Sequence, residues 1–364
     1  MAGIYIHIPF CHSKCAYCDF YSMPNTRYDE EYVQALIVEW QIRRYEVSGP
    51  FETVYIGGGT PSILAPAQLQ RIIEVLPTQG LREFTLEANP EDVTLDKVMA
   101  WRDMGINRIS MGIQSLDDEC LKRIGRRHDS VTALRAVETL QDAGITEISL
   151  DVIYGLPGQD LDSWRTTLDT LIKRRPQHLS AYALSVEPGT RLYSAATAGK
   201  WIPADDETYA RMYDILCEDT AHAGYTHYEI SNFALPGHSA IHNSHYWDMT
   251  PYIGLGPGAH SWDGRTRRVN APDLTQYLIN LAARHTAYDT EAESDADRVN
   301  DMIFTALRTD KGLDIQRLPE PFRHEFESLA AHCCDLIHDE ATVRIPQNKW
   351  LVSDAIIRDL LVGQ

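Results

Sequence analysis

The amino-acid sequence predicts an α/β fold, namely a partial, laterally open TIM-like (β/α)6 barrel followed by a small C-terminal winged-helix-like helical domain. Short apolar segments alternate with amphipathic segments up to about residue 190, a pattern typical of parallel βαβ units. Six such units are too few to close an eight-stranded barrel. Polar residues also gather where the apolar segments end, which is the face of a parallel barrel that carries ligand-binding groups.

Six segments have the composition of strands. They are Tyr5–Ile8, Thr53–Ile56, Glu83–Glu87, Arg108–Met111, Glu147–Ile153 and Leu179–Leu184. Apolar residues between them recur at three- and four-residue intervals, as on one face of a helix. The clearest examples are Tyr32, Leu36 and Trp40, and then Leu69, Ile72 and Leu76.

Composition changes along the chain predict three regions. Residues 1–195 form the barrel and residues 196–288 form a sheet and loop extension rich in aromatic residues, glycine and histidine. Residues 289–364 form the C-terminal domain, in which the stretch from Ala341 to Leu361 predicts a two-stranded wing followed by a helix. The extension contains HNSHYW and GLGPGAH, and we expect it to be irregular. GLGPGAH lacks the spacing of a dinucleotide fingerprint and predicts a turn beside the barrel opening.

Charge and composition exclude several classes of protein. A net charge of -19 repels phosphate backbones, so nucleic acid is not an expected partner. No secretory signal precedes the first strand, and no apolar run approaches the roughly 20 residues that span a bilayer. We therefore expect a cytoplasmic protein that is not an integral membrane protein.

Three cysteines form a C-x3-C-x2-C motif directly after the first strand segment: Cys11, Cys15 and Cys18. Three thiolates hold a [4Fe–4S] cluster while leaving one iron open. That iron can bind the amino and carboxylate groups of S-adenosylmethionine (SAM). The motif therefore predicts a cluster whose electron cleaves SAM to a 5′-deoxyadenosyl radical.

A structural zinc site is the alternative, because zinc prefers four filled positions and His12 or a distant residue could supply the fourth ligand. His12 directly follows Cys11 and is poorly placed to share its metal. The remaining cysteines lack paired spacing and do not form a disulfide framework.

The string YIGGGTPS follows the second strand segment and contains Gly58, Gly59 and Thr60. Successive glycines let the backbone approach a ligand closely. The GK[ST] sequence of a P-loop is absent, and a plain tight turn is the alternative. After a barrel strand and downstream of the cysteines, we interpret this string as the site of the SAM amino group.

Single polar residues lie on or just after three later strand segments: Glu87, Gln114 and Asp151. A carboxylate buried on a barrel strand is costly unless it is paired, so a cationic or hydroxylated ligand such as SAM is the expected partner. Arg126 in GRRHD could pair with the SAM carboxylate. A solvated surface arginine is the alternative for that residue.

These motifs together resemble the radical-SAM coproporphyrinogen oxidase family. The strings that carry the resemblance are YIHIPFCHSKCAYCDF, YIGGGTPS, LEANPED, MGIQS and LDVIYGLPGQ. The resemblance covers essentially the whole chain and implies a radical-SAM barrel with Cys11, Cys15 and Cys18 on the cluster. It assigns SAM binding to Tyr5, Gly58, Gly59, Thr60, Glu87, Gln114, Arg126 and Asp151.

Two departures from the oxidases point to a different branch of the family. The oxidases resemble C-x3-C-x2-C-x-C and carry an N-terminal extension, whereas this sequence has Phe20 at the fourth position and Tyr5 almost at its start. The segment HNSHYW is similar to the HNxxYW signature of heme chaperones. The resemblance therefore implies a heme carrier that delivers heme to acceptor hemoproteins, including membrane-associated respiratory enzymes.

The expected heme-binding residues are His242, His245, Tyr246 and Trp247. Either histidine could ligate the heme iron while the two aromatic rings pack on the macrocycle. A hydrogen-bonded core patch of histidines and aromatic rings is the alternative. The rival activity is oxidative decarboxylation of coproporphyrinogen III by the deoxyadenosyl radical, which product analysis would detect.

Overall fold

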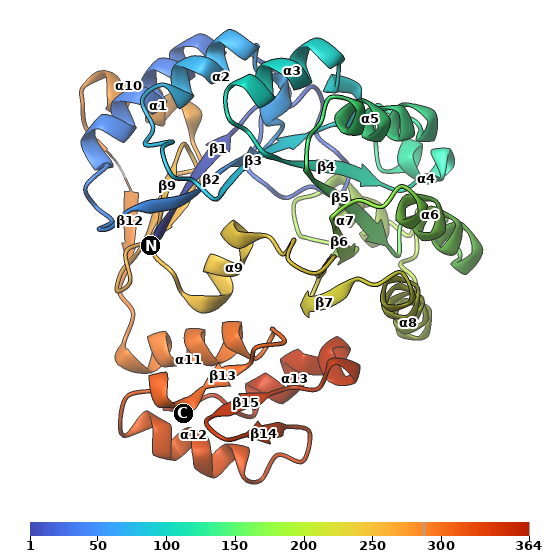
Figure 1. Ribbon diagram of the computed structural model, residues 1–364, viewed down its shortest axis with the longest axis vertical. Helices are drawn as coiled ribbons and strands as arrows, with labels where there is room; N and C mark the ends of the chain where they lie inside the picture. Colours follow the sequence, from blue (N-terminus) through green and yellow to red (C-terminus); the bar gives the residue numbers. More distant parts are fainter. Residues whose placement is uncertain (287, 364) are drawn as a thin grey trace.

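The computed structural model describes residues 1–286 and 288–363, and its central feature is a twelve-stranded sheet (Figure 1). Neighbouring strands in the middle of the sheet follow chain order and run parallel. They are β1 (Ala2–Ile8), β2 (Phe51–Gly58), β3 (Glu83–Ala88), β4 (Arg108–Gln114), β5 (Glu147–Tyr154) and β6 (His178–Ala183). The sheet has β12 and β7 as its two edges, so the barrel is open and the predicted fold class is confirmed.

Helices follow the parallel strands and cover the outer face of the sheet (Figure 1). Their bounds are α1 (Asp29–Arg43), α2 (Pro66–Ile73), α3 (Leu95–Asp103), α4 (Asp118–Arg123), α5 (Ser130–Asp142), α6 (Leu161–Lys173), α7 (Arg191–Thr197) and α8 (Asp206–His222). Aspartate side chains start several of them: Asp129 accepts from the Thr132 amide and Asp160 from the Ser163 amide, both at 2.8 Å. Each such cap stabilises its helix by about 1 kcal/mol.

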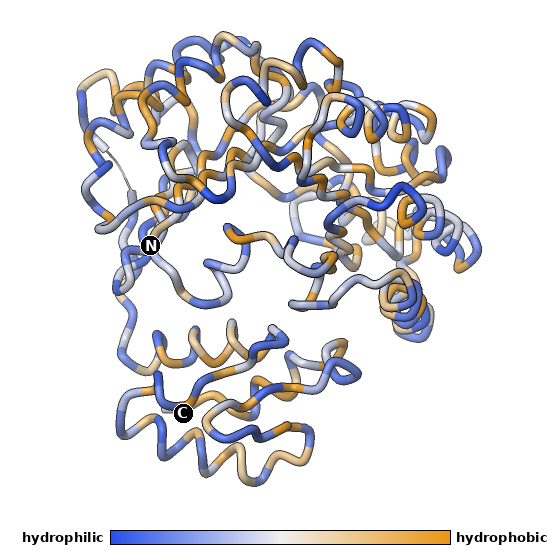
Figure 2. The backbone as a smooth tube through the Cα atoms, in the orientation of Figure 1, coloured by the Kyte–Doolittle hydropathy of each residue, from blue (hydrophilic) through white to orange (hydrophobic). Residues whose placement is uncertain are grey.

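Strand β1 shows how the sheet separates core from site. Ile4, Ile6 and Ile8 are fully buried in the main hydrophobic core, and each contributes roughly 1.5–3 kcal/mol by leaving water. Side chains alternate along a strand, so Tyr5 and His7 lie on the other face, inside the barrel. In Figure 2, hydrophobic and hydrophilic colours alternate along the central strands, as expected for strands with one face in the core and one facing a site.

The region after β6 adds strands at both ends of the sheet. β7 (Thr226–Glu229) and β8 (Asn232–Ala234) continue it beyond β6, and β9 (Tyr252–Leu255) lies parallel beside β1. The sheet then continues through β10 (His260–Trp262), β11 (Arg267–Asn270) and β12 (Tyr288–Glu291), with α10 (Leu274–Ala282) before the last strand. Between β8 and β9 lies α9 (Ile241–Asp248), which carries HNSHYW. The expectation of irregular structure there is therefore wrong.

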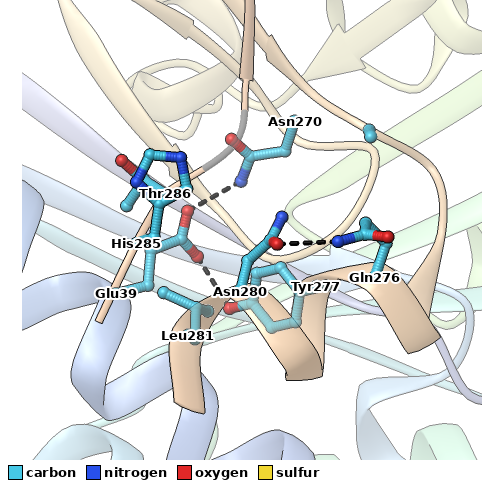
Figure 3. Close-up of a pocket in the computed structure, with 9 residues that line it drawn as sticks. Glu39, Asn270, Gln276, Tyr277, Asn280, Leu281, His285 and Thr286 are labelled. Atoms are coloured by element: carbon cyan, nitrogen blue, oxygen red, sulfur yellow. Dashed lines mark hydrogen bonds between the residues drawn. The ribbon is translucent and has the colours of Figure 1, made fainter. Parts of the chain in front are cut away.

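A buried ionic network joins α1 to the added strands. The guanidinium of Arg43 donates to the Gly254 carbonyl oxygen at 2.9 Å and to the Glu39 carboxylate at 2.7 Å. Figure 3 shows the same carboxylate accepting from Asn270 and Tyr277, both at 2.7 Å. The space beside these groups is only about 20 Å³, which holds no more than one water. The network therefore serves to hold these segments together.

The turn in GLGPGAH lies against β1. Gly256 has φ of +95°, and a Cβ there would lie 2.6 Å from the His7 carbonyl oxygen. Glycine is required at this position both for the backbone conformation and for the close approach.

The C-terminal unit has its own core, which includes Phe326 and Trp350, and lies below the barrel with α9 between them (Figure 1). Its elements are α11 (Asp295–Ala306), β13 (Leu313–Asp314), α12 (Phe322–Ala330), β14 (Ile337–Asp339), β15 (Thr342–Arg344) and α13 (Ser353–Arg358). The wing is the β14–β15 hairpin, so its first strand precedes Ala341, and Gln347–Val352 is a 3-10 helix. The predicted placement of both wing strands after Ala341 is wrong because Trp350 is drawn into the core as part of a helical turn.

Candidate functional site

The cysteine loop follows β1 and is tied back to the protein on both sides. The Cys11 amide donates to the Met23 carbonyl oxygen at 2.9 Å, and the Ala16 amide donates to the Ile124 carbonyl oxygen at 2.8 Å. These bonds fold the loop over the carboxyl ends of the strands. Cys11 is buried, whereas Cys15 and Cys18 are half-buried.

A cavity of about 440 Å³, here called the strand-end cavity, lies beneath this loop. It is lined by every predicted cluster and SAM residue except Tyr5. These residues are Cys11, Cys15, Cys18, Gly58, Gly59, Thr60, Glu87, Gln114, Arg126 and Asp151. They come from the cysteine loop, from the loop after α4 and from the ends of β2 to β5, so the barrel gathers residues that lie up to 140 positions apart in the chain.

The glycines after β2 have no room for side chains. A Cβ on Gly59 would lie 2.6 Å from the Phe10 carbonyl oxygen and 3.0 Å from the Cys11 sulfur. Gly58 has φ of +109°, and its amide donates to the Glu87 carboxylate at 3.0 Å. The glycine run therefore lets β2 touch the cysteine loop while its backbone faces the cavity.

Two carboxylates face the cavity from neighbouring parts of the sheet. Glu87 accepts from the Tyr55 hydroxyl at 2.7 Å, and Asp151 accepts from the Ser110 hydroxyl at 3.1 Å. Burial raises the pKa of Glu87 to about 7, with a further contribution from the charge of Asp151, and burial also raises the pKa of Asp151. A cationic ligand would favour the ionised form of both groups.

Gln114 ends β4, between the strands that carry Glu87 and Asp151, and Arg126 also lines the cavity. Gln114 follows a register shift in β4 and has φ of +65°, and its buried side-chain oxygen has no hydrogen-bond partner among the described residues. Backbone strain of this kind concentrates at ligand sites. Arg126 donates to Asn89 and to the Gly112 carbonyl oxygen, both at 2.7 Å, and its Nη1 lies 3.7 Å from the Cys15 sulfur. The hydrogen bonds to Asn89 and Gly112 thus fix the position of Arg126 at the cavity.

The three cysteines lie around one cavity, and burial opposes ionisation of two of their thiols. Burial raises the pKa of Cys11 and raises that of Cys18 to about 11, so binding to iron would release protons. Within residues 1–286 and 288–363, no three Cys, His, Asp or Glu side chains converge on a position for a single metal ion. Zinc needs its ligands about 2.0–2.3 Å from one point, whereas three thiols spread around one cavity suit a cluster several atoms wide.

Helix α9 places the HNSHYW residues on different sides. Its first amides, those of Ile241 and His242, donate to the Glu83 carboxylate at 2.8 and 2.9 Å. This contact from β3 explains why the segment is helical rather than irregular. The ring of His242 is fully buried and lies 2.8 Å from the Thr53 hydroxyl and 2.9 Å from the Tyr246 hydroxyl. His245 lies toward the amino ends of the strands, where its ring nitrogen is 3.9 Å from the carboxylate of Glu52.

Tyr246 and Trp247 line a second cavity of about 540 Å³, here called the aromatic cavity. Its other lining residues are Tyr5, Tyr55, Glu87, Tyr182, Glu229, Ile230, Ser231, Asn232 and Asn243. Glu87 and Tyr182 also line the strand-end cavity, so the two cavities adjoin. Tyr5, predicted to contact SAM, lies in the aromatic cavity and packs on Tyr55 and His242.

Several lining residues were missed by reasoning from the sequence. Tyr17, Asn89, Ser110 and Tyr182 face the strand-end cavity. Asn89 lies within the quoted string LEANPED and directly follows β3, and that position was the available signal; Ser110 lies on β4 just before the string MGIQS. Nothing in the local sequence around Tyr182 distinguishes it from a residue of the core.

Comparisons with known proteins agree with this geometry. Residues 5–171 match the Radical SAM superfamily. The heme chaperone HemW of Bacillus subtilis is 35% identical over 338 residues, which cover 90% of this chain and 89% of that protein. The chain belongs to the HemW family.

A second HemW relative, from Escherichia coli, is 38% identical over 73% of this chain and 72% of its own length. The solved structure of the radical SAM enzyme coproporphyrinogen III oxidase (HemN) from Escherichia coli is also similar, with a TM-score of 0.83, 22% identity, and coverage of 99% of this chain and 90% of that one. At that identity the likeness to HemN concerns the fold. In the described ranges of this HemW family member, no helix is both long and apolar enough to cross a bilayer.

Proposed function

We propose that this chain is a heme chaperone, which binds heme in the aromatic cavity and delivers it to acceptor hemoproteins such as respiratory enzymes. Membership of the HemW family supports the proposal, because its named relatives are heme chaperones. The observation that carries it is the position of α9: Tyr246 and Trp247 present aromatic surface to a cavity of about 540 Å³, a size typical of cofactor sites, which are about 300–1,000 Å³.

The strand-end cavity is proposed to hold the [4Fe–4S] cluster on Cys11, Cys15 and Cys18. When bound and reduced, such a cluster can supply the electron that cleaves SAM. The residues of the chain would bind and orient SAM. Glu87 and Asp151 offer negative charge to a cation, and the amides after β2 line the cavity. Because the two cavities share Glu87 and Tyr182, occupancy of one can affect the other.

The most detailed part of the proposal concerns which side chain would bind the heme iron. Both nitrogens of His242 already have partners at 2.8 and 2.9 Å, so ligation by His242 would require these contacts to break. Tyr246 and Trp247 already face the cavity, and they supply the packing surface for the macrocycle. We therefore propose the aromatic pair as the primary heme contact and His242 or His245 as ligands that need rearrangement.

Heme titration of the protein with a reconstituted cluster, under anaerobic conditions, tests the binding function. A saturable absorption band at one heme per chain is expected, and its absence would overturn the proposal. Trp247→Ala should weaken heme binding about tenfold through loss of aromatic packing. Trp201→Ala, which removes a half-buried tryptophan outside the aromatic cavity, is the matched control.

Delivery and the rival activity need separate measurements. Heme-loaded protein mixed with a heme-free b-type respiratory enzyme should restore the spectrum of that enzyme, whereas the Trp247→Ala variant should transfer less. Incubation of the reconstituted protein with SAM and coproporphyrinogen III should yield no protoporphyrinogen IX. Formation of that product would favour the oxidase activity over the chaperone.

A further inference from the structure

The aromatic cavity is poorly matched to one part of a heme, its two propionates. The charged residues that line this cavity within the described ranges are Glu87 and Glu229, and both are acidic. Glu229 is fully buried, and burial raises its pKa to about 7. A heme propionate beside these two carboxyl groups would lose its hydration, and it would also be repelled by their ionised forms. Among the described residues, this cavity therefore offers no cation to pair with the propionates of a heme.

One position for the propionates lies in the adjoining strand-end cavity, beside Arg126. This cation already has partners. Arg126 donates to Asn89 and to Gly112, and it also approaches the Cys15 sulfur. A propionate placed there would also compete with the ligand of the strand-end cavity. Another position lies past Trp247.

Trp247 is shared by the aromatic cavity and a third cavity of about 370 Å³, here called the junction cavity. The junction cavity lies between α9 and the C-terminal unit, which face each other in Figure 1. Its lining residues are Tyr228, Ser239, Ser244, Trp247, Asp248, Ala306, Thr309, Asp310, Lys311, Gly312, Asp314, Arg317 and Thr342. Because Trp247 lines both cavities, the two cavities adjoin at its side chain.

Two cations of the junction cavity are available for an anionic ligand. Neither Lys311 nor Arg317 has a carboxylate within 4.0 Å in the part of the chain that the structure describes. Arg317 donates to the main-chain oxygen of Asp248 at 3.0 Å, which fixes its position near α9 without neutralising its charge.

The loop that carries Lys311 is held rigidly against the barrel. The Asp310 amide donates to the Tyr228 carbonyl oxygen at 3.0 Å, and the Ile230 amide donates to the Arg308 carbonyl oxygen at 3.1 Å. Gly312 has φ of +69°, and a Cβ there would lie 2.5 Å from the Val343 carbonyl oxygen. The loop therefore presents Lys311 at a defined position next to β7, whose last residue is Glu229 of the aromatic cavity.

The carboxylates in the same cavity are occupied in other ways. Asp248 accepts from the Thr250 amide and Asp314 accepts from the Gln316 amide, both at 3.0 Å. Asp310 is half-buried; burial raises its pKa, and the nearby positive charge of Lys311 partly opposes this shift. None of these acids lies within ion-pair distance of Lys311 or Arg317 in the described residues.

We propose that the junction cavity is the carboxylate subsite for the tetrapyrrole, in which Lys311 and Arg317 bind the propionates while the macrocycle packs on Trp247. This inference rests on the proposed heme-binding function and adds a role for the C-terminal unit. The barrel then supplies the aromatic surface, and the C-terminal unit supplies the charge. Removal of heme to an acceptor would require both contacts to be released.

The test compares heme with heme dimethyl ester, whose propionates carry no charge. Dissociation constants are measured anaerobically, in one detergent-containing buffer, for the natural chain, Lys311→Ala, Arg317→Ala and the double variant. Each single variant should weaken heme binding about two- to fivefold, and the double variant more, because Lys311 and Arg317 are exposed and exposed ion pairs have this strength. Lys349→Ala is the matched control, since it removes a lysine of the C-terminal unit that pairs with Asp335 outside the cavity.

Ester binding should be equal in the natural chain and the double variant. Equal loss of heme and ester affinity would show a packing defect and would overturn the carboxylate subsite. Unchanged heme binding by the double variant would also overturn it, while leaving the chaperone proposal intact. Failure of the natural chain to bind heme at all would overturn both.

Discussion

At the scale of single residues, Glu87 serves two opposed requirements. Burial raises its pKa from 4.5 to about 7, so its ionised form destabilises the folded chain. The same charge faces a cavity proposed to bind a cationic ligand. Retention of a costly carboxylate at such a position is typical of a binding site rather than of a structural core.

The stability cost of Glu87 can be measured in the ligand-free protein. The folded carboxyl keeps its proton between about pH 4.5 and pH 7 while the unfolded one does not, so the free energy of unfolding falls as pH rises through this window. Glu87→Gln removes this contribution. The difference between variant and natural chain should therefore be about 1–3 kcal/mol more favourable to the variant at pH 8 than at pH 4.5. Urea unfolding at the two pH values checks it, and a pH-independent difference would contradict it.

A second prediction at the residue scale concerns the lack of space for a side chain at Gly59. A methyl group at Gly59→Ala would meet the Phe10 carbonyl oxygen and the Cys11 sulfur, so the cysteine loop would have to move. Iron and sulfide bound per chain after reconstitution should fall to less than about half. Gly80→Ala, where φ is +81° and no atom lies within 4 Å of the new Cβ, should lose about 1 kcal/mol of stability but keep its iron. Equal iron in both variants would refute the steric explanation.

At the scale of elements, α9 divides the interior of the molecule. One side of this helix faces the aromatic cavity through Tyr246 and Trp247, and Trp247 also faces the junction cavity. Its beginning is fixed by a carboxylate from β3 rather than by a cap of its own. The orientation of Tyr246 and Trp247 therefore depends on contacts between distant segments, including those of Glu83 with the start of α9 and of Thr53 with His242.

Loss of Glu83 should accordingly disorder the start of α9. Glu83→Ala removes a buried charged acceptor from two amides and should lower the free energy of unfolding by about 2–4 kcal/mol. It should also weaken heme binding while leaving reconstituted iron unchanged. Denaturant unfolding and heme titration on the same preparation check both effects. Glu30→Ala, which removes an exposed carboxylate paired with Arg71, should cost less than about 1 kcal/mol.

At the scale of the whole molecule, buried polar contacts connect the open barrel to its later segments. Arg43 links α1 to β9 and to the residues around β10 and β11, with hydrogen bonds to Glu39, Gly254, Ser261 and Asn270. Because these segments close one end of the sheet, the network helps to hold β9 beside β1.

Arg43→Met should therefore destabilise the entire fold. It leaves the Glu39 carboxylate buried without its cation, at a cost of about 3–5 kcal/mol. Adding Glu39→Gln should recover part of this loss because the uncompensated charge disappears. Thermal unfolding of the single and double variants checks the coupling. A double variant that is less stable than Arg43→Met would show that the charge is not the cause.

The sequence by itself predicted the parallel strands, the open barrel and most of one cavity. Local pattern was sufficient because each strand is a short apolar run and because the predicted site residues lie at strand ends, as with Gly59 and Glu87. The carboxyl ends of parallel strands meet at one edge, so a motif after each strand predicts a shared site without knowledge of the packing.

Only the tertiary structure decided the remainder. The helical state of HNSHYW depends on Glu83 from β3, and the burial of His242 depends on Thr53 from β2. The approach of Lys311 to α9 depends on how the C-terminal unit packs beneath the barrel. These contacts join segments far apart in the chain, and their energies come from burial and pairing that no local pattern records.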